Sequence, residues 1–322
     1  MKRLLVGYKA ADLLSRGKHG KLVTSDLLEG DVTLHTLDIY HRHAIEKVHH
    51  AKAICSAHLP AGDWDEIYFR TGPKLMSGEL ALDLLQEIHL LKPKKFVLDF
   101  DGKERDKNAL LAKIKDDPDR IRSFAAKWSA SVPGGKSLEF TSFPGCFCHR
   151  REDQGGLALA EVVSREMRER FEKFDKFEKL NLLDMGCGCG LVGFLIASSL
   201  SNLSNASNLL NLTMVDSHSR AVEAAKLNAE NFGFASEVIL ADNGTPVRMN
   251  GSFDVFVGNP PYYSDYRIAE VFLETAKRAL KKGGVCYTVV KNPDGLKPVQ
   301  EKYFDKVEIL NRRGYAVLKS IN

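Results

Sequence analysis

The carboxyl-terminal half of this 322-residue chain alternates short apolar runs with longer segments of helical periodicity. The runs with strand character are LNLLDMG (180–186), LTMVD (212–216), SEVILAD (236–242), FDVFVGN (253–259) and GVCYTVV (284–290). The segments with helix character are LVGFLIASSL (191–200), SRAVEAAKLNAENFG (219–233), YRIAEVFLETAKRALKKGG (266–284) and KPVQEKYF (297–304). Strands that alternate with helices predict an α/β fold with a mostly parallel sheet. The last run, VEILNRRGYAVLKS (307–320), predicts an antiparallel terminal hairpin.

The amino-terminal half repeats part of this order. Three segments match: 34–52 resembles 212–230, 65–75 resembles 253–263, and 77–100 resembles 266–290. Three matches in the same order indicate an internal duplication. In this alignment Asp38 takes the place of Asp216, and Arg42 takes the place of Arg220.

The two copies differ at the ends of their strands. The first has Thr71-Gly72-Pro73-Lys74 where the second has Asn259-Pro260-Pro261-Tyr262, and Gly7-Tyr8-Lys9-Ala10 where the second has a glycine-rich loop. We therefore expect a degenerate first domain over residues 1–128 and a ligand-binding domain over residues 146–322. Pro, Gly and Ser cluster between them, which predicts a linker over residues 129–145.

The composition limits the class of protein. With 44% apolar and 27% charged residues, it is typical of a soluble globular protein. A net charge of +4 permits a nucleic-acid partner but does not require one. The start of the chain lacks the long apolar core of a signal peptide, and no apolar stretch approaches the length of a membrane span. We expect a cytoplasmic protein that does not associate with membranes.

Cysteines and histidines raise the question of a metal. Cys146 with Cys148, and Cys187 with Cys189, form C-x-C pairs, whereas zinc sites more usually show C-x2-C spacing. We interpret these cysteines as small buried thiols and expect no metal site. The histidines concentrate in the first half, where His41, His43, His49 and His50 are interpreted as solvated surface. Lys92, Lys94, Lys95, Arg312 and Arg313 are candidates for an RNA-binding face.

A glycine-rich loop lies between the first strand and the first helix of the second half. Gly186, Gly188 and Gly190 allow a sharp turn and a close approach of ligand to backbone. The spacing is G-x-G-x-G, whereas the dinucleotide fingerprint is G-x-G-x-x-G. Asp184, two residues before the first glycine, suits a ligand that carries an ammonium group.

Two further aspartates follow the next strands. Asp216 could accept both ribose hydroxyls of an adenosine and could also cap the following helix, since both roles can hold together. Asp242 could accept a hydrogen bond from an adenine amino group, or could belong to an Asp-Asn-Gly turn. Since parallel strands end at one edge of a sheet, we expect both residues to lie beside the glycine loop.

The fourth strand ends in Asn259-Pro260-Pro261-Tyr262. Neither proline can donate to a sheet ladder, and both stiffen the chain. This set of residues resembles the S-adenosylmethionine-dependent methyltransferases that modify exocyclic or amide nitrogens. The resemblance covers the second half of the chain and implies a Rossmann-like seven-stranded methyltransferase domain.

The resemblance also implies roles for single residues. The cofactor S-adenosylmethionine would be bound by Asp184, Gly186, Gly188, Gly190, Asp216 and Asp242. The side-chain oxygen of Asn259 and the carbonyl of Pro260 would accept the two protons of a target NH2, with Pro261 fixing the geometry. Tyr262 would stack on the planar substrate. Acceptors placed in this way favour the pyramidal nitrogen that attacks a sulfonium methyl group.

A narrower resemblance is carried by FPGCFCHRREDQGGLAL (143–159), which is similar to the "PGxFS…DxGS" segment of the bacterial ribosomal RNA guanine-N2 methyltransferases. Those enzymes also consist of two homologous halves, of which the first is degenerate. The chain departs from the pattern at Cys148, Gly156 and Tyr262. The resemblance implies ribosomal RNA or a ribosomal subunit as partner, and a supporting or RNA-docking role for the first half.

Other functions remain open at this point. The same tetrad could serve an adenine-N6 methyltransferase of RNA or DNA, or a glutamine-N5 methyltransferase of a translation factor. A DNA enzyme would need a target-reading insertion, and the glutamine enzymes usually carry a short helical leader. An NAD-dependent oxidoreductase is disfavoured by the glycine spacing and the proline corner. A non-enzymatic RNA-binding scaffold fits the first half only.

Overall fold

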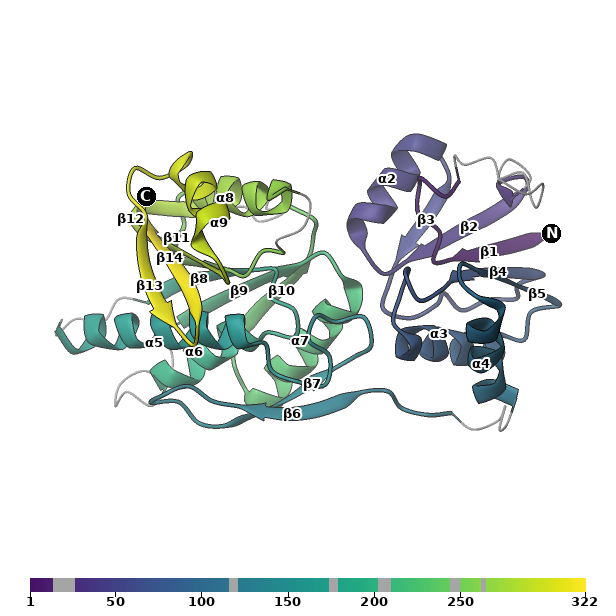
Figure 1. Ribbon diagram of the computed structural model, residues 1–322, viewed down its shortest axis with the longest axis horizontal. Helices are drawn as coiled ribbons and strands as arrows, with labels where there is room; N and C mark the ends of the chain where they lie inside the picture. The colour runs from purple at the N-terminus through teal and green to yellow at the C-terminus, as the bar shows by residue number, and fades with distance from the viewer. Residues whose placement is uncertain (14–26, 116–120, 174–178, 202–209, 244–249, 262–264) are drawn as a thin grey trace. The chain divides into compact units, whose positions relative to one another are not determined.

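The structure is a computed structural model that describes residues 1–13, 27–115, 121–173, 179–201, 210–243, 250–261 and 265–322. The chain divides into two compact units (Figure 1). Unit 1 comprises Met1–Ala125, Phe143–Gly145 and His218–Arg220, and unit 2 comprises Ala126–Ser142, Cys146–Ser217 and Ala221–Asn322. Within the described residues, none of the helices is both long and apolar enough to cross a membrane.

Unit 1 is built on a five-stranded parallel sheet of order β3-β2-β1-β4-β5. Its strands are β1 (Lys2–Val6), β2 (Asp31–Thr36), β3 (Lys52–Cys55), β4 (Glu66–Thr71) and β5 (Lys95–Phe100). Its helices are α2 (Ile39–His49), α3 (Gly78–Leu91) and α4 (Glu104–Lys115). Helix α2 covers one face of the sheet, and α3 and α4 lie on the other (Figure 1).

Unit 2 is built on a seven-stranded sheet of order β10-β9-β8-β11-β12-β14-β13. Its strands are β8 (Leu180–Met185), β9 (Leu210–Asp216), β10 (Ser236–Leu240), β11 (Phe253–Gly258), β12 (Leu280–Val290), β13 (Glu308–Arg312) and β14 (Tyr315–Ile321). The first five strands of this order are parallel. Strand β14 pairs antiparallel with β12, and β13 pairs antiparallel with β14. The predicted α/β fold and terminal hairpin are confirmed.

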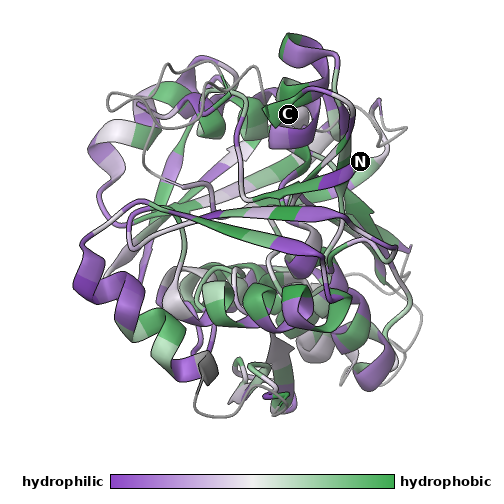
Figure 2. Ribbon diagram, turned by 90° about the vertical axis from the view of Figure 1, so that its right-hand side faces the viewer, coloured by the Kyte–Doolittle hydropathy of each residue, from purple (hydrophilic) through white to green (hydrophobic). Residues whose placement is uncertain are grey.

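The helices of unit 2 lie on both faces of the sheet, with α5, α6 and α7 on one side and α8 and α9 on the other (Figure 1). They are α5 (Gln154–Lys173), α6 (Leu191–Ser201), α7 (Ser219–Phe232), α8 (Arg267–Ala279) and α9 (Pro293–Glu301). In each unit the buried apolar residues come from the strands and from the helix faces that pack on them, and Figure 2 shows apolar residues along the strands that face the viewer. This distribution follows from the apolar periods in the sequence.

The two sheets share one strand order over five strands, since β3-β2-β1-β4-β5 corresponds to β10-β9-β8-β11-β12. This agreement is what the duplication predicts. The alignment of Asp38 with Asp216 is wrong by two residues. Gly7 N donates to His35 O in the first unit, as Gly186 N donates to Val215 O in the second, so Thr36 corresponds to Asp216. Asp38 instead caps α2, because its Oδ1 accepts from Tyr40 N at 2.9 Å.

Two boundaries differ from the sequence expectations. Strand β12 begins at Leu280, whereas a helix was expected to continue to the glycines at 283 and 284. Leu280 pairs with Phe253, with a register shift before the main ladder, so the sheet takes over residues of helical periodicity. In the region expected to be a linker, β6 (Ala126–Ala130) and β7 (Leu138–Ser142) form an antiparallel hairpin. Trp128 stacks on Phe140 there, with ring centroids 4.9 Å apart.

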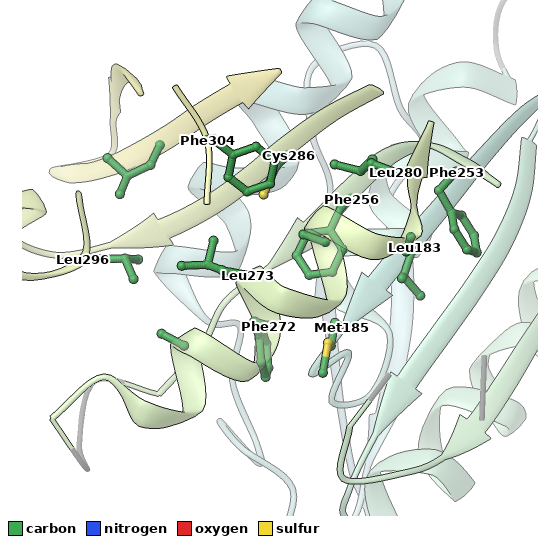
Figure 3. Close-up of a cluster of buried hydrophobic side chains, with 14 of the residues drawn as sticks. Leu183, Met185, Phe253, Phe256, Phe272, Leu273, Leu280, Cys286, Leu296 and Phe304 are labelled. Carbon is green, nitrogen blue, oxygen red and sulfur yellow. The ribbon is translucent and has the colours of Figure 1, made fainter. Parts of the chain in front are cut away.

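One part of the core of unit 2 is formed where α8 packs against the sheet (Figure 3). Phe256 and Leu273 are fully buried, and Phe272 lies beside Met185 at the end of β8 (Figure 3). Burial of aromatic side chains of this size contributes about 1.5–3 kcal/mol each. Helix α8 is therefore held firmly at the carboxyl edge of the sheet.

The corresponding edge of unit 1 is filled by its own side chains. Tyr8 is buried, and the Arg70 guanidinium pairs with Asp12 at 3.2 Å and with Asp99 at 2.8 Å. A Cβ on Gly72 would lie 2.1 Å from Asp101 O, so the chain that follows β4 packs directly on the end of β5. Internal ion pairs and close backbone packing therefore occupy this edge of unit 1.

Candidate functional site

The strand order of unit 2 brings the residues of interest to one edge of its sheet. β8 lies between β9 and β11, and β10 pairs with β9 (Figure 1). Asp184, Asp216 and Asn259 therefore come from neighbouring strand ends. Ala241 N donates to Asp216 O at 3.0 Å, so Asp242 follows β10 next to the end of β9. Tyr262 lies outside the described residues.

The glycine loop is anchored to the end of β9. Gly186 N and Cys187 N both donate to Val215 O, at 2.8 and 3.1 Å, and Gly188 N donates to Asp216 Oδ2 at 2.8 Å. These bonds fold the loop over the strand end. The carboxylate of Asp216 thus holds the glycine loop through Gly188.

Two of the glycines have different surroundings. Both take left-handed backbone angles, with φ of +57° at Gly188 and +89° at Gly190. A Cβ on Gly190 would lie 2.2 Å from the Phe194 ring, which is fully buried and packed against Phe232. A Cβ on Gly188 would meet no atom within 4 Å. The loop is therefore closely packed against Phe194 at Gly190 and open at Gly188, where a ligand could approach the backbone.

Asp184 lies behind the loop. Its side chain is 2% exposed, and its Oδ2 accepts from Gly193 N at 2.9 Å, in the first turn of α6. Burial raises the pKa of this carboxyl from 3.8 to about 7; the Gly193 bond opposes the rise and the nearby Asp216 carboxylate adds to it. The group is close to its titration midpoint at neutral pH, so a cation placed nearby would favour its charged form.

Asn259 follows β11 at the same edge. Gly258 and Gly186 both pack on the Phe272 ring, because a Cβ would lie 2.9 Å and 2.7 Å from it, respectively. Pro260 is buried, and Pro261 is half-buried. The glycine loop and the residue before the proline corner therefore pack on one aromatic ring of α8, that of Phe272, which Figure 3 labels.

Asp153 is a site residue that the sequence reasoning did not include. Its Oδ2 accepts from Asn259 Nδ2 at 2.6 Å and from Gly156 N at 2.6 Å. The second bond caps α5, and the first fixes which end of the Asn259 amide faces α5. Its signal in the sequence was Asp153-Gln154-Gly155-Gly156 ahead of an apolar helix, within the segment that resembled a family motif.

The cysteines of the loop serve packing. Cys187 and Cys189 are buried between the glycines, and burial raises the pKa of both thiols above the usual range. Across the described ranges of the chain, no group of three or more His, Cys, Asp or Glu side chains could hold a metal ion.

Comparison with known proteins gives the class to which this site belongs. The family described as methyltransferase small domain matches residues 137–319, which is more than half of the chain. The chain belongs to this family. The predicted class, an S-adenosylmethionine-dependent methyltransferase of Rossmann-like α/β fold, is thereby confirmed.

More particular similarities are to single proteins. The uncharacterized protein YbxB of Bacillus subtilis is 26% identical over 62% of this chain and 93% of its own length. The ribosomal RNA small subunit methyltransferase C of Pseudomonas syringae pv. syringae is 28% identical over 59% of this chain and 52% of its own. The chain thus spans about half the length of the curated methyltransferase C relatives that it matches.

One solved structure is similar along the whole chain. The T. thermophilus 16S rRNA N2 G1207 methyltransferase (RsmC), in complex with AdoMet and guanosine, has a TM-score of 0.76. The similarity covers 100% of this chain and 88% of that one, at 18% sequence identity. At this identity the similarity shows a shared fold.

The loop glycines give a first testable prediction. Gly190→Ala should lower the free energy of unfolding by about 2–5 kcal/mol, because left-handed strain adds to a clash with Phe194. Gly188→Ala is the matched control and should cost only the strain, about 1–2 kcal/mol. Urea denaturation measures both. Equal losses for the two variants would contradict the packing described for Gly190.

Asp184 gives a second prediction, for Asp184→Asn. The folded-state pKa is raised, so Asp184 favours folding most at low pH, and this contribution is lost as pH rises from about 4 to about 7. Asn keeps an acceptor for Gly193 N but cannot titrate. Relative to the variant, the wild type should lose on the order of a few kcal/mol of unfolding free energy over that interval. Denaturation at several pH values measures the difference, and a constant difference would contradict it.

Proposed function

We propose that this protein transfers the methyl group of S-adenosylmethionine to the exocyclic amine of a guanine in ribosomal RNA. The observation that carries the proposal is the bond from Asn259 Nδ2 to Asp153, beside the glycine loop. It leaves the amide oxygen of Asn259, rather than its NH2 group, available to a substrate. The similarity to enzymes named as ribosomal RNA small subunit methyltransferase C supports the choice of substrate.

The residues at the sheet edge suit the cofactor. The open face of Gly188 would let the ligand approach the loop, Asp216 and Asp242 offer acceptors for ribose hydroxyls and an adenine amine, and Asp184 offers negative charge to an ammonium group. When bound, S-adenosylmethionine supplies a methyl group on a positively charged sulfur.

The protein's own contribution is to orient the target amine. Asn259 Oδ1 and the Pro260 carbonyl would accept its two N–H groups, which draws the nitrogen lone pair out of conjugation with the ring. The prolines fix both acceptors before substrate arrives, so little reorganisation is needed. Tyr262 would stack on the base.

Adenine-N6 and glutamine-N5 methylation are the alternatives within this chemistry, since each offers a planar NH2 group to the same acceptors. A guanine is favoured by the solved structure with guanosine, which shares the fold along the whole of this chain. We place the proposed reaction on the ribosomal subunit or its RNA in the cytoplasm. Unit 1, with its edge filled by ion pairs, would support unit 2 or dock RNA.

Asn259→Ala tests the proposed function. The variant should lower the single-turnover rate of methyl transfer by about 100-fold or more, the scale for one preorganised hydrogen-bonding group. The assay follows labelled methyl from S-adenosylmethionine into ribosomal subunits, bulk RNA or protein taken from cells that lack this protein. Asn231→Ala, an exposed change of the same kind on α7, is the control.

The product decides between the alternatives. Nucleoside analysis should find N2-methylguanosine in one ribosomal RNA. Label in adenine or in a glutamine side chain would reassign the substrate, and no label with any material would refute the enzyme proposal.

Asp153 is proposed as a positioning residue that acts through Asn259. Asp153→Ser keeps a helix cap but is too short to reach the amide, so turnover should fall about 10-fold or more while cofactor affinity stays unchanged. Asp153→Asn keeps the acceptor and should retain most of the activity. In the Asn259→Ala background, Asp153→Ser should cost nothing further. Additive losses would show that Asp153 acts on its own.

A further inference from the structure

Three cationic side chains surround the turn of the β13–β14 hairpin in unit 2. Arg312 and Arg313 stand at the turn, where Arg312 pairs with Tyr315 across the hairpin. Lys291 follows the end of β12, and its Nζ lies 4.5 Å from the centroid of the Tyr315 ring. We refer to Lys291, Arg312 and Arg313 as the hairpin cation cluster.

A single buried carboxylate holds the two arginines. Glu161 of α5, whose side chain is 4% exposed, accepts from Arg313 Nε at 2.8 Å and from Arg312 Nε. Burial would raise the pKa of Glu161, but the bonds from Arg313 and Arg312 hold it below its usual range. One negative charge against three positive ones leaves the group with a net charge of +2. The arginine side chains remain 46% and 38% exposed, so this charge faces solvent.

The backbone of the turn is unusual for its sequence. Arg313 and Gly314 both have left-handed angles, with φ of +50° and +71°. A two-residue turn of this kind favours Asn or Gly at its first position, and a long side chain there costs free energy. The bonds from Arg313 to Glu161 and Gln154 offset part of this cost and hold its guanidinium in place.

The cluster is continuous with the proposed site for the target amine. Arg313 Nη1 donates to Gln154 Oε1 at 3.2 Å, and a Cβ on Gly155 would lie 3.3 Å from the Tyr315 ring. Asp153, which precedes Gln154 and Gly155 in the chain, accepts a hydrogen bond from Asn259. β12 also pairs with β11, so Lys291 and Asn259 follow adjacent strand ends of one sheet edge.

We propose that the hairpin cation cluster binds the phosphates of the RNA that flanks the target nucleotide. This inference rests on the proposed function, because it assumes an RNA substrate. Arginine forks and a lysine ammonium suit phosphate oxygens, and contacts of this kind position a substrate without reading its sequence. The two guanidinium groups are held in place by Glu161, so less of their conformational freedom is lost on binding.

The test compares Lys291→Gln and Lys291→Gln/Arg312→Gln with the wild type. Lys282→Gln is the charge-matched control, because Lys282 is exposed near the opposite end of β12. Each lost phosphate contact should raise the Kd for the RNA substrate about 3–10-fold and reduce the slope of log Kd against log salt by about 0.7–0.9. The Kd for S-adenosylmethionine and the rate at saturating RNA should not change, and the melting temperature checks the fold.

Direct RNA binding, measured without methyl transfer, separates this inference from the proposed function. Tight RNA binding that both variants weaken would support the cluster even if the target base proved different. Unchanged Kd and salt slope in both variants would overturn the inference and leave the cluster a structural clamp. Binding to polyglutamate that matches binding to RNA would also overturn it.

Discussion

The parallel pairing of β8 with both β9 and β11 is the constraint on which the site depends. It sets three strand ends side by side, so the glycine loop, Asp216 and Asn259 emerge at the same edge. The loop closes on β9 through Val215 O and the Asp216 carboxylate. A slip of one residue in either pairing would separate the loop from its acceptors and reverse the inward-facing side chains.

Two carboxyl groups hold polar groups in place at this edge of the sheet. Asp184 holds the first turn of α6, and Asp153 holds both the first turn of α5 and the amide of Asn259. Asp184 joins strand β8 to a helix start, and Asp153 joins a helix start to the corner that follows β11. Both carboxylates accept from amides at helix starts, where the positive end of the helix dipole favours a negatively charged acceptor.

The sequence predicted the strand–helix alternation, the terminal hairpin and the edge on which the site residues lie, because these follow from local periods and from the geometry of parallel sheets. It did not predict the bond between Asp153 and Asn259, which are 106 residues apart, since no local pattern encodes that approach. It misaligned Asp38 with Asp216 because the residues of segment 34–52 resemble those of segment 212–230, whereas the strands of the two copies correspond with a shift of two residues. The start of β12 was missed because cross-strand pairing outweighed the helical character of Leu280 and the residues after it.

Phe272 supports two separate parts of the candidate site as well as the core of unit 2. The same ring lies under Gly186, in the loop proposed for the donor, and under Gly258, beside the corner proposed for the acceptor. Small displacements of α8 would therefore carry both partners together and preserve the gap between them. Helix α8 thus supports both elements, and we expect a displacement of this helix to shift the loop and the corner in the same direction rather than apart.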